Sequence, residues 1–351
     1  MLNVLFFLTF SAISVGSVPL WRNAVTRKRA GERILDAREM SGSPFGFIDV
    51  VGTFSFWFGA QIVSSFLALY VLGLESGKLD EATGSQLAWF SIVAGMNLLV
   101  ATIAAMALLY LRYLRFSILG LQTSNLSQDL MIGVVAFVMV IPGILGLQWL
   151  LTMLVEYKHS TMEMVANDSS LLTVGAAWFS AVLVAPICEE VFFRGILQAW
   201  LQRLTLVRHN QSDQILSDRV LFGGWDSVPH ETTEAGDHAV EPVTTVTATI
   251  DSETSWLTDS YWPILLSAAL FGLAHAGQGP APIPLFVFGL VLGYLYRKTG
   301  SIIPCIVLHM LLNAFSMFWF TLQVLFADSE SASILQPRIL NELGVMIGRL
   351  F

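Results

Sequence analysis

The sequence has little charge. Asp, Glu, Lys and Arg make up 13% of its 351 residues, which is about half of the roughly 25% found in soluble globular domains. Hydrophobic residues make up 55%, and the mean hydropathy is +0.67. A chain of this length has too few polar side chains to cover the surface of soluble domains. The lipid bilayer is the solvent that fits this composition.

The sequence also lacks an excess of basic residues and has only two cysteines. A formal net charge of −8 argues against a nucleic-acid partner, which requires a basic face. Cys188 and Cys305 lie inside apolar runs without CxxC spacing, so neither a disulfide framework nor a thiolate metal site is indicated. Both are interpreted as small core residues.

Long apolar runs are abundant. A membrane-spanning helix needs about 20 apolar residues. Five runs lie at 1–21, 45–74, 87–111, 130–155 and 171–188, and three more, closer together, at 261–276, 282–296 and 301–326. The sequence therefore predicts an all-α, polytopic membrane protein of about eight transmembrane helices, which makes the lipid bilayer its first partner.

The distribution of Lys and Arg predicts the orientation in the membrane. Positive charge follows the first run instead of preceding it, so this run is expected to stay as a membrane helix and not to act as a signal peptide. Six bases lie between the first two runs: Arg22, Arg27, Lys28, Arg29, Arg33 and Arg38. Because basic residues favour the cytoplasmic side, we expect this connection inside and the N-terminus outside. The connections that carry only Lys78 or Lys158 are then outside.

A polar insertion at 205–260 interrupts the apolar pattern. It carries ten acids and two bases, which account for the whole net charge, since 16 acids and 16 bases remain elsewhere. Its Thr-rich, low-complexity sequence is typical of a solvated loop, and its histidines (His209, His230 and His238) are interpreted as surface residues. The predicted organisation is 1–170 as N-terminal transmembrane helices, 171–326 as a membrane domain that contains the insertion, and 327–351 as a tail.

Ionisable residues inside membrane helices are functional candidates by default. Here they are concentrated in three C-terminal runs: Glu189, Glu190 and Arg194 in the first, His275 in the second, and His309 with Asn313 in the third. Glu190 and Arg194 are four residues apart, so they can pair on one helix face. Glu189 points about 100° away and has no local cation, which suits a general base. The alternative for this first group is an ion-pair cluster at the membrane interface.

The histidines allow two interpretations as well. His309 and Asn313 share a helix face, where they either hold two helices together or donate hydrogen bonds to a substrate. His275 alone is typical of an interfacial residue. Together, however, these groups could hydrolyse an amide: Glu189 takes a proton from water, His275 orients that water, and His309 and Asn313 stabilise the oxyanion. Cys305 is four residues before His309, so a cysteine protease fits the spacing but is disfavoured.

Three short motifs resemble a known family. The segments EEVFFR (189–194), FGLAH (271–275) and HMLLN (309–313) are similar, in order, to the EExxxR, FxxxH and HxxxN motifs of the CPBP family. This family groups type II CAAX prenyl endopeptidases with bacteriocin-processing and self-immunity (Abi) membrane proteins. The resemblance covers about 171–326. It implies that Glu189 and His275 activate water, that Glu190 and Arg194 support the site, and that His309 and Asn313 form the oxyanion pocket.

The resemblance leaves the metal dependence open. Members are often called metalloproteases, and Glu189, His275 and His309 could bind zinc as a His₂Glu set. A helical HExxH motif is absent, and we favour glutamate-activated water without a metal or other cofactor. The long polar insertion departs from the family, in which the connection between the first two motifs is usually short.

The leading prediction is an intramembrane endopeptidase of a bacterial plasma membrane, with its active site in the C-terminal helices. Its expected substrate is a membrane-anchored or amphipathic peptide of the CAAX or leader type. The alternatives are a non-catalytic membrane scaffold or immunity protein, and a proton or ion pathway. One conflict remains at this point: if every run crosses the membrane once, Glu189 and His275 lie on opposite sides. A single long helix from about 171 to 203, bent near Pro186, would place Glu189 near its middle and ease the conflict.

Overall fold

The computed structural model describes residues 2–38, 43–73, 83–114, 119–121, 125–154, 160–210, 222–223 and 260–330. Within these ranges every regular element is a helix, so the predicted all-α class is confirmed. Of the predicted insertion at 205–260, only 205–210, 222–223 and 260 are described, and the predicted tail is described only as far as Glu330.

Among the described residues, six helical segments are long and apolar enough to cross a membrane. Five of them are α1 (Leu2–Arg29), α2 (Phe47–Leu72), α3 (Gly84–Tyr113), α4 (Leu126–Thr152) and α12 (Ile303–Glu330). The sixth is the long helix described below. The chain is therefore an integral, multi-pass membrane protein, while the expected number of eight crossings is not confirmed.

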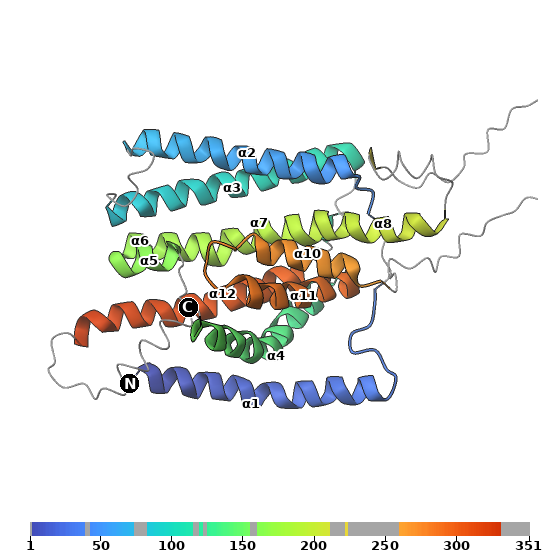
Figure 1. Ribbon diagram of the computed structural model, residues 1–351, viewed down its shortest axis with the longest axis horizontal. Helices are drawn as coiled ribbons and strands as arrows, with labels where there is room; N and C mark the ends of the chain where they lie inside the picture. The colour runs from blue at the N-terminus through green and yellow to red at the C-terminus, as the bar shows by residue number, and fades with distance from the viewer. Residues whose placement is uncertain are drawn as a thin grey trace, which may run out of the picture.

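The long helix is a continuous run of five segments, seen across the centre of Figure 1. These are α6 (Leu171–Trp178), η3 (Phe179–Val184), α7 (Ala185–Glu190), η4 (Val191–Gln198) and α8 (Ala199–Asn210). The two η segments are π-helices, which are rare and frequently occur at functional sites. Pro186 lies in the first turn of α7, and the helix continues through it. The predicted long helix from 171 is thus confirmed.

Two shorter helices form a hairpin beside the long helix. They are α10 (Trp262–Leu273) and α11 (Pro282–Thr299). The base of the hairpin is closed by Arg297, whose Nη1 donates to the carbonyl oxygen of Ser260 at 3.1 Å and whose guanidinium stacks on Tyr261. With twelve residues, α10 is about 18 Å long, which is too short to cross the roughly 30 Å hydrocarbon core. The hairpin therefore enters the bundle and returns to the side from which it came.

One end of the bundle is basic. Helix α1 ends in Arg27, Lys28 and Arg29, α3 ends beside Arg112, and α11 ends beside Arg297 and Lys298. These helix ends lie together, because the Arg38 amide donates to the Lys298 carbonyl and Arg112 pairs with Asp49 at the start of α2. We call this the basic end.

The opposite end holds the short helix α5 (Ser160–Asn167), and we call it the α5 end. Here α6 begins beside α3, since the Thr173 hydroxyl contacts the Gly84 carbonyl oxygen at 3.5 Å. Asp168 organises this start. It accepts hydrogen bonds from the Thr173 hydroxyl and from the Ser170 amide and hydroxyl. These bonds favour the carboxylate and lower the pKa of Asp168, with the Thr173 bond contributing most.

Candidate active site

The long helix and the hairpin bring the first two motifs to the same depth. Glu189 and Glu190 lie in α7, near the middle of the spanning segment Leu171–Thr205. His275 lies at the tip of the hairpin, just after α10. Because α10 does not cross the membrane, its end meets the middle of the long helix. Glu189 and His275 therefore lie at the same depth, and not on opposite sides of the membrane as single crossings of every apolar run would place them.

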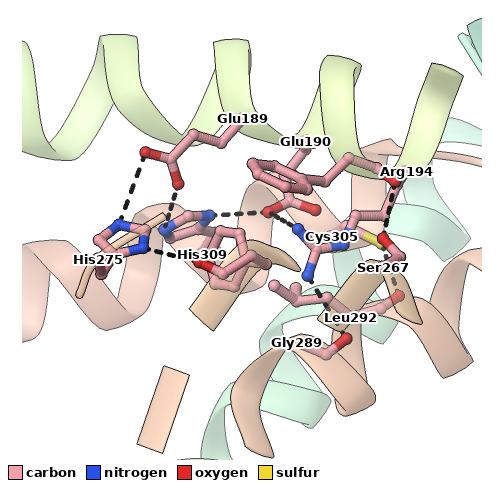
Figure 2. A network of polar contacts seen from close by, with 11 residues as sticks. Glu189, Glu190, Arg194, Ser267, His275, Gly289, Leu292, Cys305 and His309 are labelled. Atoms are coloured by element: carbon pink, nitrogen blue, oxygen red, sulfur yellow. Dashed lines mark hydrogen bonds and ion pairs between the residues drawn. The ribbon is translucent and has the colours of Figure 1, made fainter. Parts of the chain in front are cut away.

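Three side chains converge on one point (Figure 2). The Glu189 carboxylate has one oxygen 4.0 Å from Nε2 of His275 and the other 3.9 Å from Nε2 of His309, which comes from α12. All three side chains are mostly buried, with 19%, 19% and 5% of their surfaces exposed. These separations are too long for direct hydrogen bonds and are suited to a water molecule between the groups.

The other ring nitrogen of each histidine is held by an acceptor. Nδ1 of His275 is 2.9 Å from the Phe271 carbonyl oxygen, and Nδ1 of His309 is 2.9 Å from Oε1 of Glu190. Each Nδ1 must therefore carry the hydrogen and donate it. In the neutral rings, Nε2 then presents its lone pair toward Glu189.

Glu190 and Arg194 form the predicted ion pair, which lies next to His309. Nη1 of Arg194 donates to Oε1 of Glu190 at 3.2 Å, and both side chains are fully buried. Arg194 also donates to the Gly289 carbonyl oxygen and lies over the Phe271 ring at 4.5 Å. The pair thus ties the long helix to both arms of the hairpin. The alternative of an ion-pair cluster at the membrane interface does not fit a pair without solvent exposure.

Glu189, His275, His309 and Asn313 line one cavity of about 420 Å³. Asn313, four residues after His309 in α12, donates from Nδ2 to the Ala181 carbonyl oxygen in η3 at 2.8 Å. A carboxamide nitrogen carries two hydrogens, so one remains for another acceptor. The helix-joining role and the oxyanion role of Asn313 are therefore compatible.

The cavity has further polar residues that the sequence motifs do not include. They come mainly from the N-terminal half and include Gln61, Ser91, Gln148 and Thr161. Gln61, Ser91 and Gln148 stand singly in apolar runs, and Thr161 lies in a polar connection. None of them has a spacing that would relate it to the motifs. Only the fold places them on the cavity wall.

The cysteines are buried, as predicted from the sequence. The Cys305 thiol donates to the Leu292 carbonyl oxygen at 3.2 Å. This hydrogen bond gives Cys305 a packing role between α12 and α11.

Glu189, His275 and His309 are residue types that bind zinc, but the distances between their ligand atoms are too long for one zinc ion. Ligand atoms about 2.0–2.2 Å from a tetrahedral zinc ion lie roughly 3.3–3.5 Å apart, whereas the Nε2–Oε separations here are 4.0 and 3.9 Å. Within the described residues, no group of three or more His, Cys, Asp or Glu is close enough to hold a metal ion.

Comparison with known proteins agrees with the motifs. Residues 172–315 match the family described as type II CAAX prenyl endopeptidase Rce1-like. This range contains all six candidate residues (Glu189, Glu190, Arg194, His275, His309 and Asn313). No curated protein and no solved structure matches the chain.

Proposed function

Since residues 172–315 match the family described as type II CAAX prenyl endopeptidase Rce1-like, we propose that this protein hydrolyses a peptide bond within the membrane. The substrate is a membrane-anchored or amphipathic peptide, and the membrane is a bacterial plasma membrane. The observation that carries the proposal is the Glu189 carboxylate facing two imidazole Nε2 atoms at 4.0 and 3.9 Å.

In the proposed first step, a water molecule lies between Glu189 and His275. The water donates one hydrogen bond to Glu189 and one to Nε2 of His275, whose Nδ1–H is fixed on the Phe271 carbonyl. As the water oxygen attacks the substrate carbonyl carbon, Glu189 takes a proton, and the carbonyl oxygen becomes an oxyanion. A positioned base of this kind contributes about 10²–10⁴-fold in rate.

His309 and Asn313 are the proposed oxyanion donors. Neutral His309 has no hydrogen on Nε2, because its hydrogen is on Nδ1 and points to Glu190. Only the imidazolium form can therefore donate from Nε2 into the cavity, while its Nδ1–H stays on the Glu190 carboxylate. The second Nδ2 hydrogen of Asn313 is the other donor. Glu190 acts through His309 and is thus a positioning residue.

In the final step, the tetrahedral intermediate collapses and the C–N bond breaks. Glu189 gives its proton to the leaving nitrogen, and the other fragment leaves with the new carboxyl group. Glu189 returns to the carboxylate form. The cycle consumes one water molecule and needs no redox partner.

The proposal is tested by a cleavage assay with purified protein in lipid. We expect Glu189→Gln and His275→Ala to lower the cleavage rate by about 10²–10⁴-fold, because each removes a group that positions or deprotonates the water. The matched control is Glu163→Gln, which makes the same acid-to-amide change on the exposed surface of α5 and should leave the rate unchanged. Wild-type cleavage rates in folded Glu189→Gln protein would overturn the mechanism, whereas a folded unaltered protein that cleaves no peptide would favour a non-catalytic membrane scaffold or immunity protein.

Adding a zinc chelator to the same assay distinguishes glutamate-activated water from zinc-dependent hydrolysis. Glutamate-activated water predicts that a strong zinc chelator leaves the cleavage rate unchanged. A loss of activity that added zinc restores would instead assign Glu189, His275 and His309 as metal ligands.

A further inference from the structure

The cavity reaches from the catalytic residues toward only one end of the bundle. Its lining residues include one side of α3 between Phe90 and Leu98, in the first half of that helix, Gln148 near the end of α4, and Thr161 and Met162 of α5. Ser180 and Ala181, which precede Glu189 in the long helix, line it as well. All of these positions lie on the α5 side of Glu189, given that α3 starts and α4 ends at that side (Figure 1).

The path toward the basic end is filled. Arg194 and Gln198 follow Glu189 on the long helix, and both are fully buried against α11, where they donate to the carbonyl oxygens of Gly289 and Gly293. Phe288 and Leu292 of α11 are also fully buried. A peptide could not pass from the basic end to Glu189 without displacing this packing.

The charges at the two ends assign them to the two sides of the membrane. The basic end carries Arg27, Lys28, Arg29, Arg33, Arg112, Arg297 and Lys298. At the α5 end, the connection between α2 and α3 and the connection between α4 and α5 each carry a single base, Lys78 and Lys158. Cytoplasmic segments near transmembrane helices are enriched in Lys and Arg. The basic end is therefore cytoplasmic, and the α5 end faces the opposite side.

We propose that the catalytic cavity is reached from the non-cytoplasmic side, and that its substrate is a peptide segment exposed on that side. The substrate is then an exported or membrane-anchored peptide with its cleavage site outside the cytoplasm. A peptide held at the cytoplasmic surface would meet the closed basic end. The cleavage step rests on the function proposed above, whereas the side of access rests on the cavity and the charges alone.

The wall of the cavity suits a peptide chain. Carboxamide and hydroxyl groups of Gln148, Ser91 and Ser180 alternate with apolar side chains such as Ile144 and Met317. Peptide groups need hydrogen-bond partners when they leave water, and these polar side chains can supply them. A peptide chain has both amide groups and apolar side chains, so it can use both kinds of contact.

The test labels single introduced cysteines with a membrane-impermeant maleimide in intact cells that express the full chain. Both native cysteines are buried, so the unaltered protein is the background control. Gln148→Cys probes the cavity, Glu163→Cys probes the exposed surface of α5, and Arg33→Cys probes the exposed segment at the basic end. We expect Gln148→Cys and Glu163→Cys to be labelled as fully in intact as in permeabilised cells, and Arg33→Cys only after permeabilisation.

Other outcomes overturn the inference. Labelling of Gln148→Cys only after permeabilisation would place access on the cytoplasmic side or deny aqueous access, and outside labelling of Arg33→Cys would reverse the orientation. Cleavage gives an independent readout: labelled Gln148→Cys protein should lose activity, and labelled Glu163→Cys protein should not. If the labelling follows expectation but unlabelled protein cleaves no peptide, the proposed function fails while the side of access stands.

Discussion

At the scale of single residues, Glu190 is the most constrained group of the site. One of its oxygens accepts from Nδ1 of His309 at 2.9 Å and from Nη1 of Arg194 at 3.2 Å, and the carboxylate is fully buried. Such a group serves two purposes: it neutralises a buried guanidinium, and it fixes the hydrogen of His309. The two purposes can be separated by mutation.

We expect Glu190→Gln to destabilise the fold, because it leaves the Arg194 charge buried without a counter-ion. Breaking a buried pair in this way typically costs about 3–5 kcal/mol. Adding Arg194→Met removes that charge and should recover most of the thermal stability, since buried pairs are often replaceable by apolar side chains. Cleavage should stay low, because a Gln amide can present either its oxygen or its NH₂ group to Nδ1 and so no longer fixes the orientation and hydrogen of His309. Recovery of both stability and activity in the double variant would contradict the positioning role of Glu190.

At the scale of elements, the hairpin depends on close contact between its arms. A Cβ atom at Gly272 of α10 would lie 2.6 Å from the Pro282 carbonyl oxygen at the start of α11. Backbone atoms cannot move aside as a flexible side chain can, so any larger residue must open the hairpin. Gly272 is three residues before His275, and this opening would displace the imidazole.

Gly272→Ala is therefore expected to cost about 1–3 kcal/mol, as overpacking typically does, and to lower the cleavage rate. The matched variant is Gly277→Ala in the hairpin tip, where an added Cβ would meet nothing within 4 Å. Thermal unfolding and cleavage rates of the two variants provide the comparison. Equal effects of both substitutions would show that the contact with Pro282 does not hold His275 in place.

The α10–α11 hairpin is an element that local sequence patterns do not predict, although they do predict which residues share a helix face. The spacing of Glu190 and Arg194, and of His309 and Asn313, predicts shared helix faces, and the structure has the ion pair at 3.2 Å. The run at 282–296 looks like a short span, however, because hydropathy records whether a segment is apolar and not how deep it lies. What makes it one arm of a hairpin is long-range contact: Arg297 to Ser260, and the close packing at Gly272. No local pattern encodes such contacts.

At the scale of the whole molecule, the catalytic half depends on the N-terminal half. The Rce1-like match begins at residue 172, yet the cavity walls include Ser91 of α3 and Gln148 of α4. Helix α1 in turn packs on α4, where the indole of Trp21 donates to the Met139 carbonyl oxygen at 2.9 Å, and on α12 through Phe6 and Trp319. The first four spanning helices thus close a site to which they contribute none of the motif residues.

The orientation of the whole molecule should depend on the first cytoplasmic connection. Neutralising Arg27, Lys28, Arg29 and Arg33 to Gln removes most of the positive charge in the last turn of α1 and the connection that follows it. The cost to folding should be small, since the surface pair of Arg27 with Glu32 is solvent-exposed and such pairs contribute about 0–1 kcal/mol.

Because positive charge near the first helix favours the cytoplasmic side, we expect part of the population to insert in reverse. Outside labelling of a Glu163→Cys reporter in the same chain should then fall, and outside labelling of a cysteine at the basic end should rise by the same fraction. The control, Lys78→Gln with Lys158→Gln, removes bases from the opposite connections and should leave the reporter fully labelled from outside. Equal outside labelling of the reporter with and without the four substitutions would contradict this expectation. The orientation would then be set by the other bases of the basic end, Arg112 of α3 and Arg297 and Lys298 of α11.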